Sequence, residues 1–400
     1  MFWPALTAKL TAGLCLGLIY LFYYDGVGDT WLYFNDGQVL SAFARRDPLG
    51  YLSFLWKGEA ELAFISDVAL QPRTLYLLKL TSVFNLLSHD NYWITSAYFS
   101  LVSFLAAWYV VCQLTESVPS AYWPAVAGFL FFPSAIFWSS GLIKESVAMA
   151  GLFLLGGCFL RVWFGYRLRF WEWILIPVAV WVVWSLKYYF LGVWIPVAMA
   201  SLCVHRASAA GWLPSALFPR ILLWGASLAI PLALVLTLHP NFEPHHLAEV
   251  IVDNYRAFHD DSRPDDLVYY DGLNANWSSI LLHSPKALVA GLFRPTLWEA
   301  GNLWQYAAAL ENAVLILLFL TAVGNLRSFT RSPQRLLVVT VLLFSAILAT
   351  FLALSTPNLG TLSRYRVGFL SPLVTVLATG SPLFQRLCDV MQRYHARLAR

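Results

Sequence analysis

The chain has 400 residues, of which 59% are hydrophobic and only 12% are charged, and its formal net charge is +4. A soluble domain of this length does not need so many apolar residues to fill its core, so the composition excludes a water-soluble globular protein. The basic residues gather in a few loops and in the C-terminal tail, which indicates membrane topology and does not favour nucleic-acid binding. The five cysteines show no paired spacing and predict neither a disulfide nor a zinc site.

Apolar stretches long enough to cross a bilayer recur along the whole chain. We therefore expect an all-α, polytopic membrane protein with about ten transmembrane helices (ten or eleven), forming a single integral-membrane domain over residues 1–400. The candidate spans lie near residues 5–24, 74–88, 92–114, 122–140, 145–163, 170–186, 189–204, 221–238, 305–325, 336–354 and 367–384. The stretch 279–293 is interrupted by Pro285 and Lys286, so it is predicted to be an interfacial or re-entrant helix.

Lysine and arginine counts in the short loops place both termini in the cytoplasm, but eleven crossings would put the basic loop 161–169 outside. One early segment therefore should not cross, and we favour 122–140, since Pro133 breaks its helix. The alternative that also places the loop 161–169 in the cytoplasm is that the N-terminus lies outside. Ten spans in the bacterial inner membrane leave two external regions, a first loop at 25–73 with amphipathic helices and a polar cap at 239–304.

Three carboxylates, Asp25, Asp29 and Asp36, follow directly after the first apolar stretch in a chain with only 22 acidic residues. Acids at the edge of a bilayer lie where the dielectric constant falls and their pKa values can be adjusted, which favours catalysis. The alternative is that each of them is a solvated turn residue among interfacial aromatic side chains. The local concentration of acids favours a functional cluster.

Lys144, Glu145 and Glu311 lie within or between apolar segments, where ionisable side chains are costly and are usually paired or functional. Adjacent residues do not face each other on a helix, so Lys144 and Glu145 should each have a separate partner, and a phosphate is a candidate for Lys144. The alternative is that this pair only begins a helix at the interface.

Two arginines, Arg364 and Arg366, flank Tyr365 in the predicted external loop before the last span. A guanidinium group can donate hydrogen bonds to two phosphate oxygens at once and stays charged, so these residues predict a phosphate or pyrophosphate site. The alternative is that they reach outward to lipid headgroups of the outer leaflet. Arg294 and Glu299 are further candidates for substrate binding, although they could also pair with each other at the surface.

Histidine and acid spacing in the cap does not favour a metal. His245 and Glu249 could share one face of a helix, as a metal site requires, but Pro244 and the many neighbouring acids favour a solvated helix start. We expect no metal and no other cofactor.

Acids after the first span, a broken helix with a Lys-Glu pair, and an Arg-Tyr-Arg stretch before the last helix together resemble the GT-C superfamily of integral-membrane glycosyltransferases. The chain also resembles uncharacterised bacterial membrane proteins with similar Phe-Pro-Ser-x-x-Phe-Trp-x-Ser-Gly-x-x-Lys-Glu, Arg-Pro-x-x-Trp-Glu-Ala and Arg-Tyr-Arg stretches. The GT-C resemblance implies a polyprenyl-phosphate sugar donor, Asp29 as the first choice of catalytic base and Asp25 as the second, and Arg364 with Arg366 as phosphate ligands. The adjacent Asp-Glu pair usual in that superfamily is absent here, which leaves the choice of base open.

The expected activity is transfer of a sugar from a polyprenyl-phosphate donor to a glycan, lipid or protein acceptor of the cell envelope, on the outer face and with inversion. Asp29 would deprotonate the acceptor while arginine stabilises the leaving phosphate, in one pocket shared by Asp29 and Arg364. Two alternatives stay open. An O-antigen polymerase or ligase would act on lipid pyrophosphate without the aspartates, and a transporter or flippase of lipid-linked glycans would have no catalysis, although transporters often show inverted repeats that this chain lacks.

Overall fold

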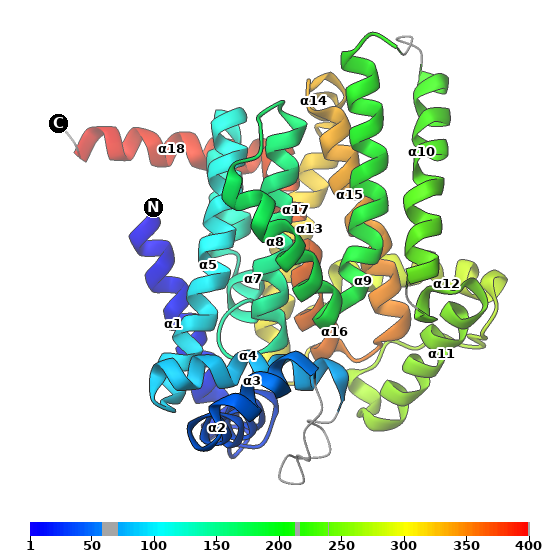
Figure 1. The fold of residues 1–400 in the computed structure, drawn as a ribbon. Helices are drawn as coiled ribbons and strands as arrows, with labels where there is room; N and C mark the ends of the chain where they lie inside the picture. Colours follow the sequence, from blue (N-terminus) through cyan, green and yellow to red (C-terminus); the bar gives the residue numbers. More distant parts are fainter. Residues whose placement is uncertain (58–70, 213–216, 239, 399–400) are drawn as a thin grey trace. The chain divides into compact units, whose positions relative to one another are not determined.

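A computed structural model describes residues 1–57, 71–212, 217–238 and 240–398 (Figure 1). Among these residues the regular elements are helices, and the only paired extended backbone is an isolated bridge between Leu267 and Asn358. The expectation of an all-α fold is therefore confirmed for the described part of the chain.

Seven helices in the described residues are long and apolar enough to cross a membrane, or eight if one strongly bent pair counts as a span. The seven are α1 (Phe2–Phe22), α5 (Tyr92–Ser117), α8 (Lys144–Trp163), α9 (Phe170–Ala209), α10 (Leu217–Leu238), α13 (Leu303–Val323) and α15 (Arg335–Ser355). The bent pair is α17 (Val367–Gly380) with the first part of α18 (Pro382–Leu398). The chain is thus a polytopic helical membrane protein, with fewer candidate spans than the ten predicted.

Two helices explain most of this difference. The 40-residue α9 covers both predicted spans 170–186 and 189–204, and it is counted as one candidate span. Lys187, between the two predicted spans, has a non-helical backbone (φ −145°, ψ 58°). The predicted span 74–88 is the 17-residue α4 (Pro72–Ser88), which is not among the candidate spans. Its buried face carries Thr81 and Asn85, so this helix packs through polar groups.

The segment 122–140 is broken, as its proline predicted. It consists of α6 (Tyr122–Val126), a π-helical stretch at Ala127–Phe131, and α7 (Pro133–Trp138). Phe132 between them is extended (φ −67°, ψ 122°), because the ring of a proline disfavours the α conformation in the preceding residue. Whether this segment re-enters the bilayer, and on which side each loop lies, stays a prediction.

The chain divides into two compact units, and the predicted single domain over residues 1–400 is left as a prediction. Unit 1 comprises Met1–Gln113, Ala135–Val162 and Arg167–Tyr188, as far as they are described. It includes α2 (Asp29–Arg46), α3 (Pro48–Lys57) and α4, and α2 packs against α1, α3 and α4. The amphipathic stretch predicted at 49–69 is described only over α3, and residues 58–70 lie outside the described part.

Close approach of α2 and α4 depends on a glycine. A Cβ atom built on Gly37 would lie 2.7 Å from Cγ2 of Thr81 and 3.1 Å from Nδ2 of Asn85. A side chain at this position therefore requires the Thr81 side chain or α4 itself to move. Gly37 therefore sets the spacing of the helix that carries Asp29 and Asp36.

Unit 2 comprises Leu114–Ser134, Trp163–Tyr166 and Tyr189–Arg400, as far as they are described. Its core is α17, which packs against α13, α15, α6 and the π-helical stretch. The cap region contains α11 (Pro244–Asp261) and α12 (Trp277–Phe293), and α12 packs closely on α15. The predicted interfacial helix 279–293 is α12, a helix of 17 residues with Pro285 inside it.

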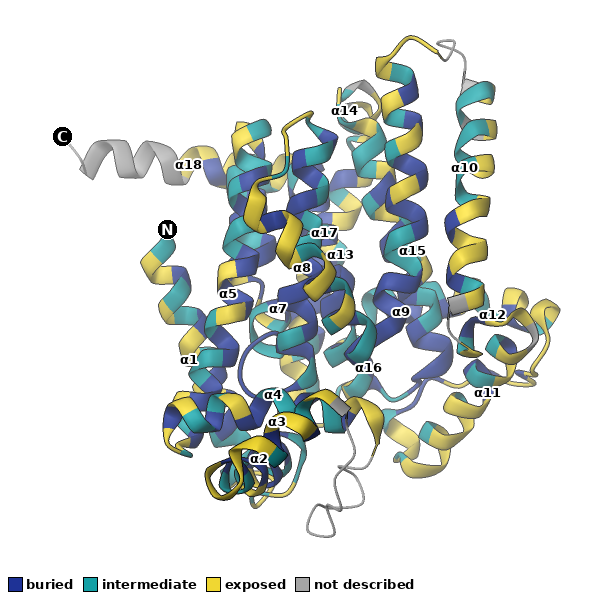
Figure 2. Ribbon diagram, viewed as in Figure 1, coloured by how far each residue is buried: buried dark blue, intermediate teal, exposed yellow. Residues whose placement is uncertain are grey.

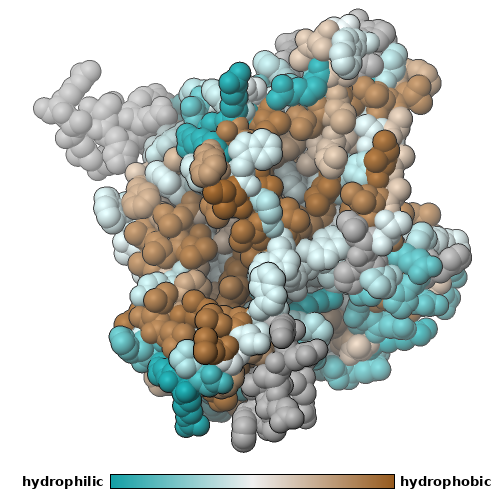
Figure 3. All heavy atoms as spheres, in the orientation of Figure 1, coloured by the Kyte–Doolittle hydropathy of each residue, from teal (hydrophilic) through white to brown (hydrophobic). Residues whose placement is uncertain are grey.

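The surface of unit 2 is apolar on one helix and polar on another. Apolar side chains of α10, among them Phe218 and Ile230, are exposed along a helix that is mostly exposed or half-buried (Figure 2). Figure 3 shows hydrophilic side chains gathered over α11. An exposed apolar helix in water would be an aggregation liability, so α10 is suited to lipid contact.

Candidate functional site

The acidic stretch after α1 is a tight turn followed by a helix. Asp25 is exposed and has a positive φ of 52°, in the left-handed region that aspartate tolerates in turns. Gly28 precedes α2 with φ 132°, a conformation that favours glycine, and Asp29 is half-buried in the first helical turn. A carboxylate there faces the positive end of the helix dipole. Asp25 thus occupies a turn, and Asp29 sits on a structured helix, where a loop was predicted.

One face of α2 carries two acids and a tyrosine. Asp29, Tyr33 and Asp36 are spaced four and three residues apart, so their side chains leave the helix on the same side. Tyr33 and Asp36 are buried. The ammonium group of Lys144 lies 5.1 Å from the centre of the Tyr33 ring, which is a favourable cation–π distance. This contact brings the acidic face of α2 to the start of α8 within unit 1.

Three pairs of neighbouring residues from unit 1 form what we call the basic ring. Its members are Arg73, Thr74, Lys144, Glu145, Lys187 and Tyr188. The first pair begins α4, the second begins α8, and the third lies at the break in α9.

Each pair of the basic ring contacts both of the others. Nζ of Lys144 donates a hydrogen bond of 2.8 Å to Oγ1 of Thr74. Nζ of Lys187 lies 2.8 Å from Oε1 of Glu145. The first and third pairs are also in contact, because the guanidinium carbon of Arg73 lies 4.6 Å from the centre of the Tyr188 ring.

The basic ring carries more positive than negative charge. Its three cations and one carboxylate sum to a formal charge of +2 (+3 − 1). The helices α4 and α8 also begin there, and the N–H groups of their first turns add positive potential. An anionic ligand such as phosphate suits this arrangement electrostatically.

The predicted separate partners of Lys144 and Glu145 are confirmed as Thr74 and Lys187. The same two residues also begin α8, as the alternative interpretation proposed. The predicted spans 170–186 and 189–204 left Lys187 in the connection between them, and neither Lys187 nor Arg73 was predicted to be a site residue. An isolated lysine in the middle of a long apolar stretch is a signal that could have identified Lys187, because such a residue is costly unless it is paired.

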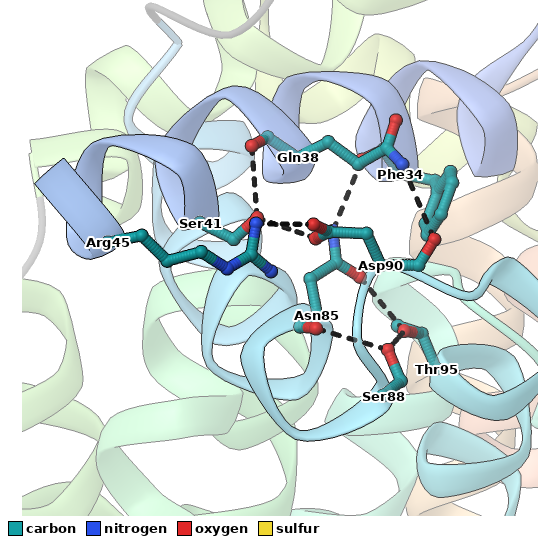
Figure 4. Close-up of polar contacts among 8 residues, drawn as sticks. All are labelled: Phe34, Gln38, Ser41, Arg45, Asn85, Ser88, Asp90 and Thr95. Carbon is teal, nitrogen blue, oxygen red and sulfur yellow. Dashed lines mark hydrogen bonds and ion pairs between the residues drawn. The ribbon is translucent and has the colours of Figure 1, made fainter.

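A polar network fixes α2 against α4 and the start of α5 (Figure 4). Ser41 donates a 2.6 Å hydrogen bond to Asp90, and Nη1 of Arg45 lies 2.6 Å from the same carboxylate. Asn85 donates from Nδ2 to the carbonyl of Phe34 over 3.4 Å and accepts from another side chain, Thr95, over 2.9 Å. These bonds hold α2 in one orientation, which fixes the direction of its acidic face.

In unit 2, the side chain of Arg366 is completely buried and connects three segments. Its Nη1 donates to the carbonyl of Leu292 over 3.1 Å and to Oδ1 of Asn312 over 2.9 Å. Asn312 in turn donates to the carbonyl of Pro295 over 2.8 Å. Within the described part of the chain, Nε and Nη2 of Arg366 have no hydrogen-bond partner. Arg366 thus joins the end of α12, the loop after it and α13 to the start of α17.

Glu311 lies beside Asn312 and is also buried in unit 2. Its Oε2 accepts a 2.6 Å hydrogen bond from the backbone N–H of Ser134, in the proline-broken segment. Its Oε1 has no hydrogen-bond partner among the described residues. The prediction that Glu311 faces protein or a cavity and avoids lipid is therefore confirmed by its burial in protein.

Arg294 and Glu299 pair with each other, as the structural alternative proposed. Nη2 of Arg294 lies 2.6 Å from Oε1 of Glu299, and Thr296 donates to Oε2 from its backbone N–H (2.8 Å) and from its hydroxyl (2.7 Å). Burial raises the pKa of Glu299, but the hydrogen bonds from Arg294 and Thr296 lower it more, so the net pKa is below its usual value. This pair stabilises the loop whose Pro295 carbonyl binds Asn312.

Unit 2 therefore brings together four predicted site residues, Arg294, Glu299, Glu311 and Arg366, around one loop. Arg364 and Tyr365 are half-buried at the end of the short α16 (Leu359–Tyr365). The other predicted site residues, including Asp29, belong to unit 1. A pocket shared by the Asp29 and Arg364 groups stays a prediction.

The predicted absence of a metal site is left as an expectation. The side chain of His245 lies outside the described residues, and the acid proposed as its partner, Glu249, lies 3.3 Å from Nδ1 of His246. Across the described ranges, no group of three or more His, Cys, Asp or Glu side chains is arranged to hold a metal ion.

No protein-family model, curated protein or solved structure matches this chain. The chain is a polytopic helical membrane protein. Its resemblance to the GT-C superfamily rests on the residues quoted from the sequence.

Proposed function

We propose that this protein is an integral-membrane glycosyltransferase that moves a sugar from a polyprenyl-phosphate donor to a hydroxyl group of an envelope glycan, lipid or protein. One observation carries most weight, namely the Tyr33–Lys144 contact between the acidic face of α2 and the basic ring. Sugar transfer from a phosphate donor needs a base for the acceptor and positive charge for the leaving group. Both types of group occur in unit 1.

Asp29 is our first choice of base and Asp25 the second. The carboxylate takes the proton of the acceptor hydroxyl while that oxygen forms a bond to the anomeric carbon. The bond from the anomeric carbon to the phosphate oxygen breaks, and the phosphate leaves with the electron pair. Attack on the side opposite the phosphate inverts the anomeric centre. Asp29 is favoured over Asp25 because it lies on the fixed helix α2, whereas Asp25 is exposed in a turn.

The phosphate ligands in this proposal are Lys144 and its neighbour Arg73, while Lys187, which is buried and paired with Glu145, positions the start of α8. The charges of the two ligands stabilise the growing negative charge on the leaving group without a metal. Of the three residues that the GT-C resemblance suggests for the lipid phosphate, Arg364 and Tyr365 stay candidates. Because the side chain of Arg366 is fully buried and already bonded to Leu292 and Asn312, we assign it a positioning role for the 294–299 loop.

A polymerase or ligase that acts on lipid pyrophosphate is the second candidate. The three cations of the basic ring would also suit a pyrophosphate, which carries more negative charge than a phosphodiester. Such an enzyme needs the cations but not Asp29.

The test uses the full chain in liposomes with a set of synthetic polyprenyl-phosphate hexoses and pentoses, and measures release of polyprenyl phosphate in the presence of envelope extract as acceptor. We expect turnover by the wild-type protein and a loss of about 10²-fold or more in Asp29→Asn, the usual contribution of a general base. Asp25→Asn is the matched control and should keep most of the turnover. Turnover that survives in Asp29→Asn would favour the polymerase or ligase, and no turnover with any donor would reject the glycosyltransferase.

A further inference from the structure

The last helix, α18, has an exposed apolar row with an exposed arginine beside it. Leu383, Leu387 and Val390 are 49%, 56% and 56% exposed, and their spacing of four and three residues places them on one face. Arg386 is exposed as well and lies one turn from both Leu383 and Val390. Further along the sequence the chain carries arginines at positions 393 and 397.

The opposite side of α18 packs on protein. Cys388 is buried, and α18 contacts α13 and α17 within unit 2. The apolar row therefore points away from the core of the unit, so it needs another partner to leave water.

A sharp bend joins α18 to α17, the apolar helix before it. The axis turns by 82° between α17 and α18, with Ser381 extended at the corner (Figure 1). The corner is held by a 2.7 Å hydrogen bond between the hydroxyls of Thr321 and Ser381, and by one of 3.2 Å from Nε2 of Gln385 to the carbonyl of Thr379. With α17 along the membrane normal, a helix that leaves it at this angle runs along the membrane plane.

The same end of unit 2 carries another exposed arginine. Asn325, at the end of α13, donates to the carbonyl of Gly380 over 3.3 Å, and Arg327 follows it in the exposed first turn of α14 (Leu326–Arg331). Arg327 and Arg386 thus place two exposed positive charges on the two helices that meet near the corner, with one exposed carboxylate, Asp389, on α18. Anionic headgroups attract such clusters near a membrane surface.

We propose that α18 lies in the headgroup layer of the bilayer that this chain spans and binds anionic lipids there. The row of Leu383, Leu387 and Val390 enters the acyl boundary, while Arg386 beside it reaches the phosphates. Charge complementarity selects anionic over zwitterionic lipid and draws the helix into the headgroup layer, while the bend directs it along the bilayer surface.

The test places a nitroxide at Leu387→Cys in the full chain, with Cys388→Ala and the other four native cysteines replaced by serine. The protein is reconstituted in bilayers of phosphatidylcholine alone or with phosphatidylglycerol added, and collision of the label with oxygen and with a water-soluble nickel chelate reports its depth. We expect a shift of the label toward the acyl region when phosphatidylglycerol is present.

The matched variants separate charge from shape. Arg386→Gln, Arg393→Gln and Arg397→Gln together should abolish the shift, whereas the three Arg→Lys replacements should keep it. The proposal is overturned by a label in water in both bilayers, by equal depth in both, or by spin–spin broadening, which would identify a second copy of the chain as the partner. Retained thermal stability of each variant in detergent confirms that it is folded.

Discussion

Nζ of Lys187 lies 2.8 Å from Oε1 of Glu145, and both side chains are buried. This ion pair joins the backbone break in α9 to the first turn of α8, the two positions where these apolar helices expose backbone groups. The basic ring therefore depends on a buried pair whose members cannot be solvated separately at low cost.

Loss of one partner of this pair should be strongly destabilising. We expect Glu145→Leu or Lys187→Met to lower the free energy of unfolding by about 3–5 kcal/mol, because each leaves one buried charge uncompensated. The double variant Glu145→Leu/Lys187→Met should lose less than either single variant. Thermal unfolding of the purified proteins in detergent measures all three, and additive losses would show that the two residues do not interact.

Close packing of α2 on α4 predicts a second effect on stability. Gly37→Ala should destabilise the protein by about 1–3 kcal/mol, since the new methyl group overlaps Thr81 and Asn85. Gly156→Ala, in the helix α8 of the same unit, is the control, because no atom lies within 4 Å of its added Cβ. It should be neutral or stabilise by up to about 1 kcal/mol. Equal unfolding temperatures for the two variants would contradict the close approach.

Much of the helical arrangement could be predicted from the sequence. Long apolar stretches predicted α1, α5, α8, α13 and α15 within a few residues, since hydropathy alone identifies such segments. Prolines predicted the break before α7. The helix α2 was missed because its Gly37 and two acids are typical of a loop, and packing against α4 stabilises a helix there.

Arg366 should act as a positioning residue. Replacement by glutamine leaves the carbonyl of Leu292 and Oδ1 of Asn312 without their hydrogen-bond donor. The free energy of unfolding should fall by about 1–3 kcal/mol for each of these buried groups. Asn312→Ala should cost a similar amount, and the double variant less than the sum, because both remove the same bond. Unfolding in detergent gives these values. Arg366→Gln with unchanged stability but weakened donor binding would make it a phosphate ligand.

The Arg294–Glu299 pair predicts loss of stability in acid. Its hydrogen bonds depress the pKa of Glu299 in the folded protein, so its stabilising effect is complete above the unfolded pKa of about 4.3 and is lost as the pH falls through the lower folded value. Comparison of wild-type and Glu299→Gln unfolding across this range should show a difference that disappears in acid. A difference that stays constant to low pH would contradict the assignment.

The candidate site was predicted less completely than the fold. Lys144, Glu145 and Glu311 stand out in the sequence because charge is rare in apolar segments, and each has a polar partner in the structure. Arg73 does not stand out, because an arginine at a helix start is ordinary. Its contact with Tyr188 depends on the tertiary path of α9, which no local pattern reveals.

Donor affinity and turnover, measured separately on Asp29→Asn and Lys144→Met, test the central claim most directly. With a synthetic polyprenyl-phosphate sugar, we predict that Asp29→Asn keeps the donor Kd of the wild-type protein but loses about 10²-fold or more in turnover, as expected for a base. Lys144→Met should weaken donor binding. Turnover by Asp29→Asn at the wild-type rate, with the donor bound equally well, would contradict the account.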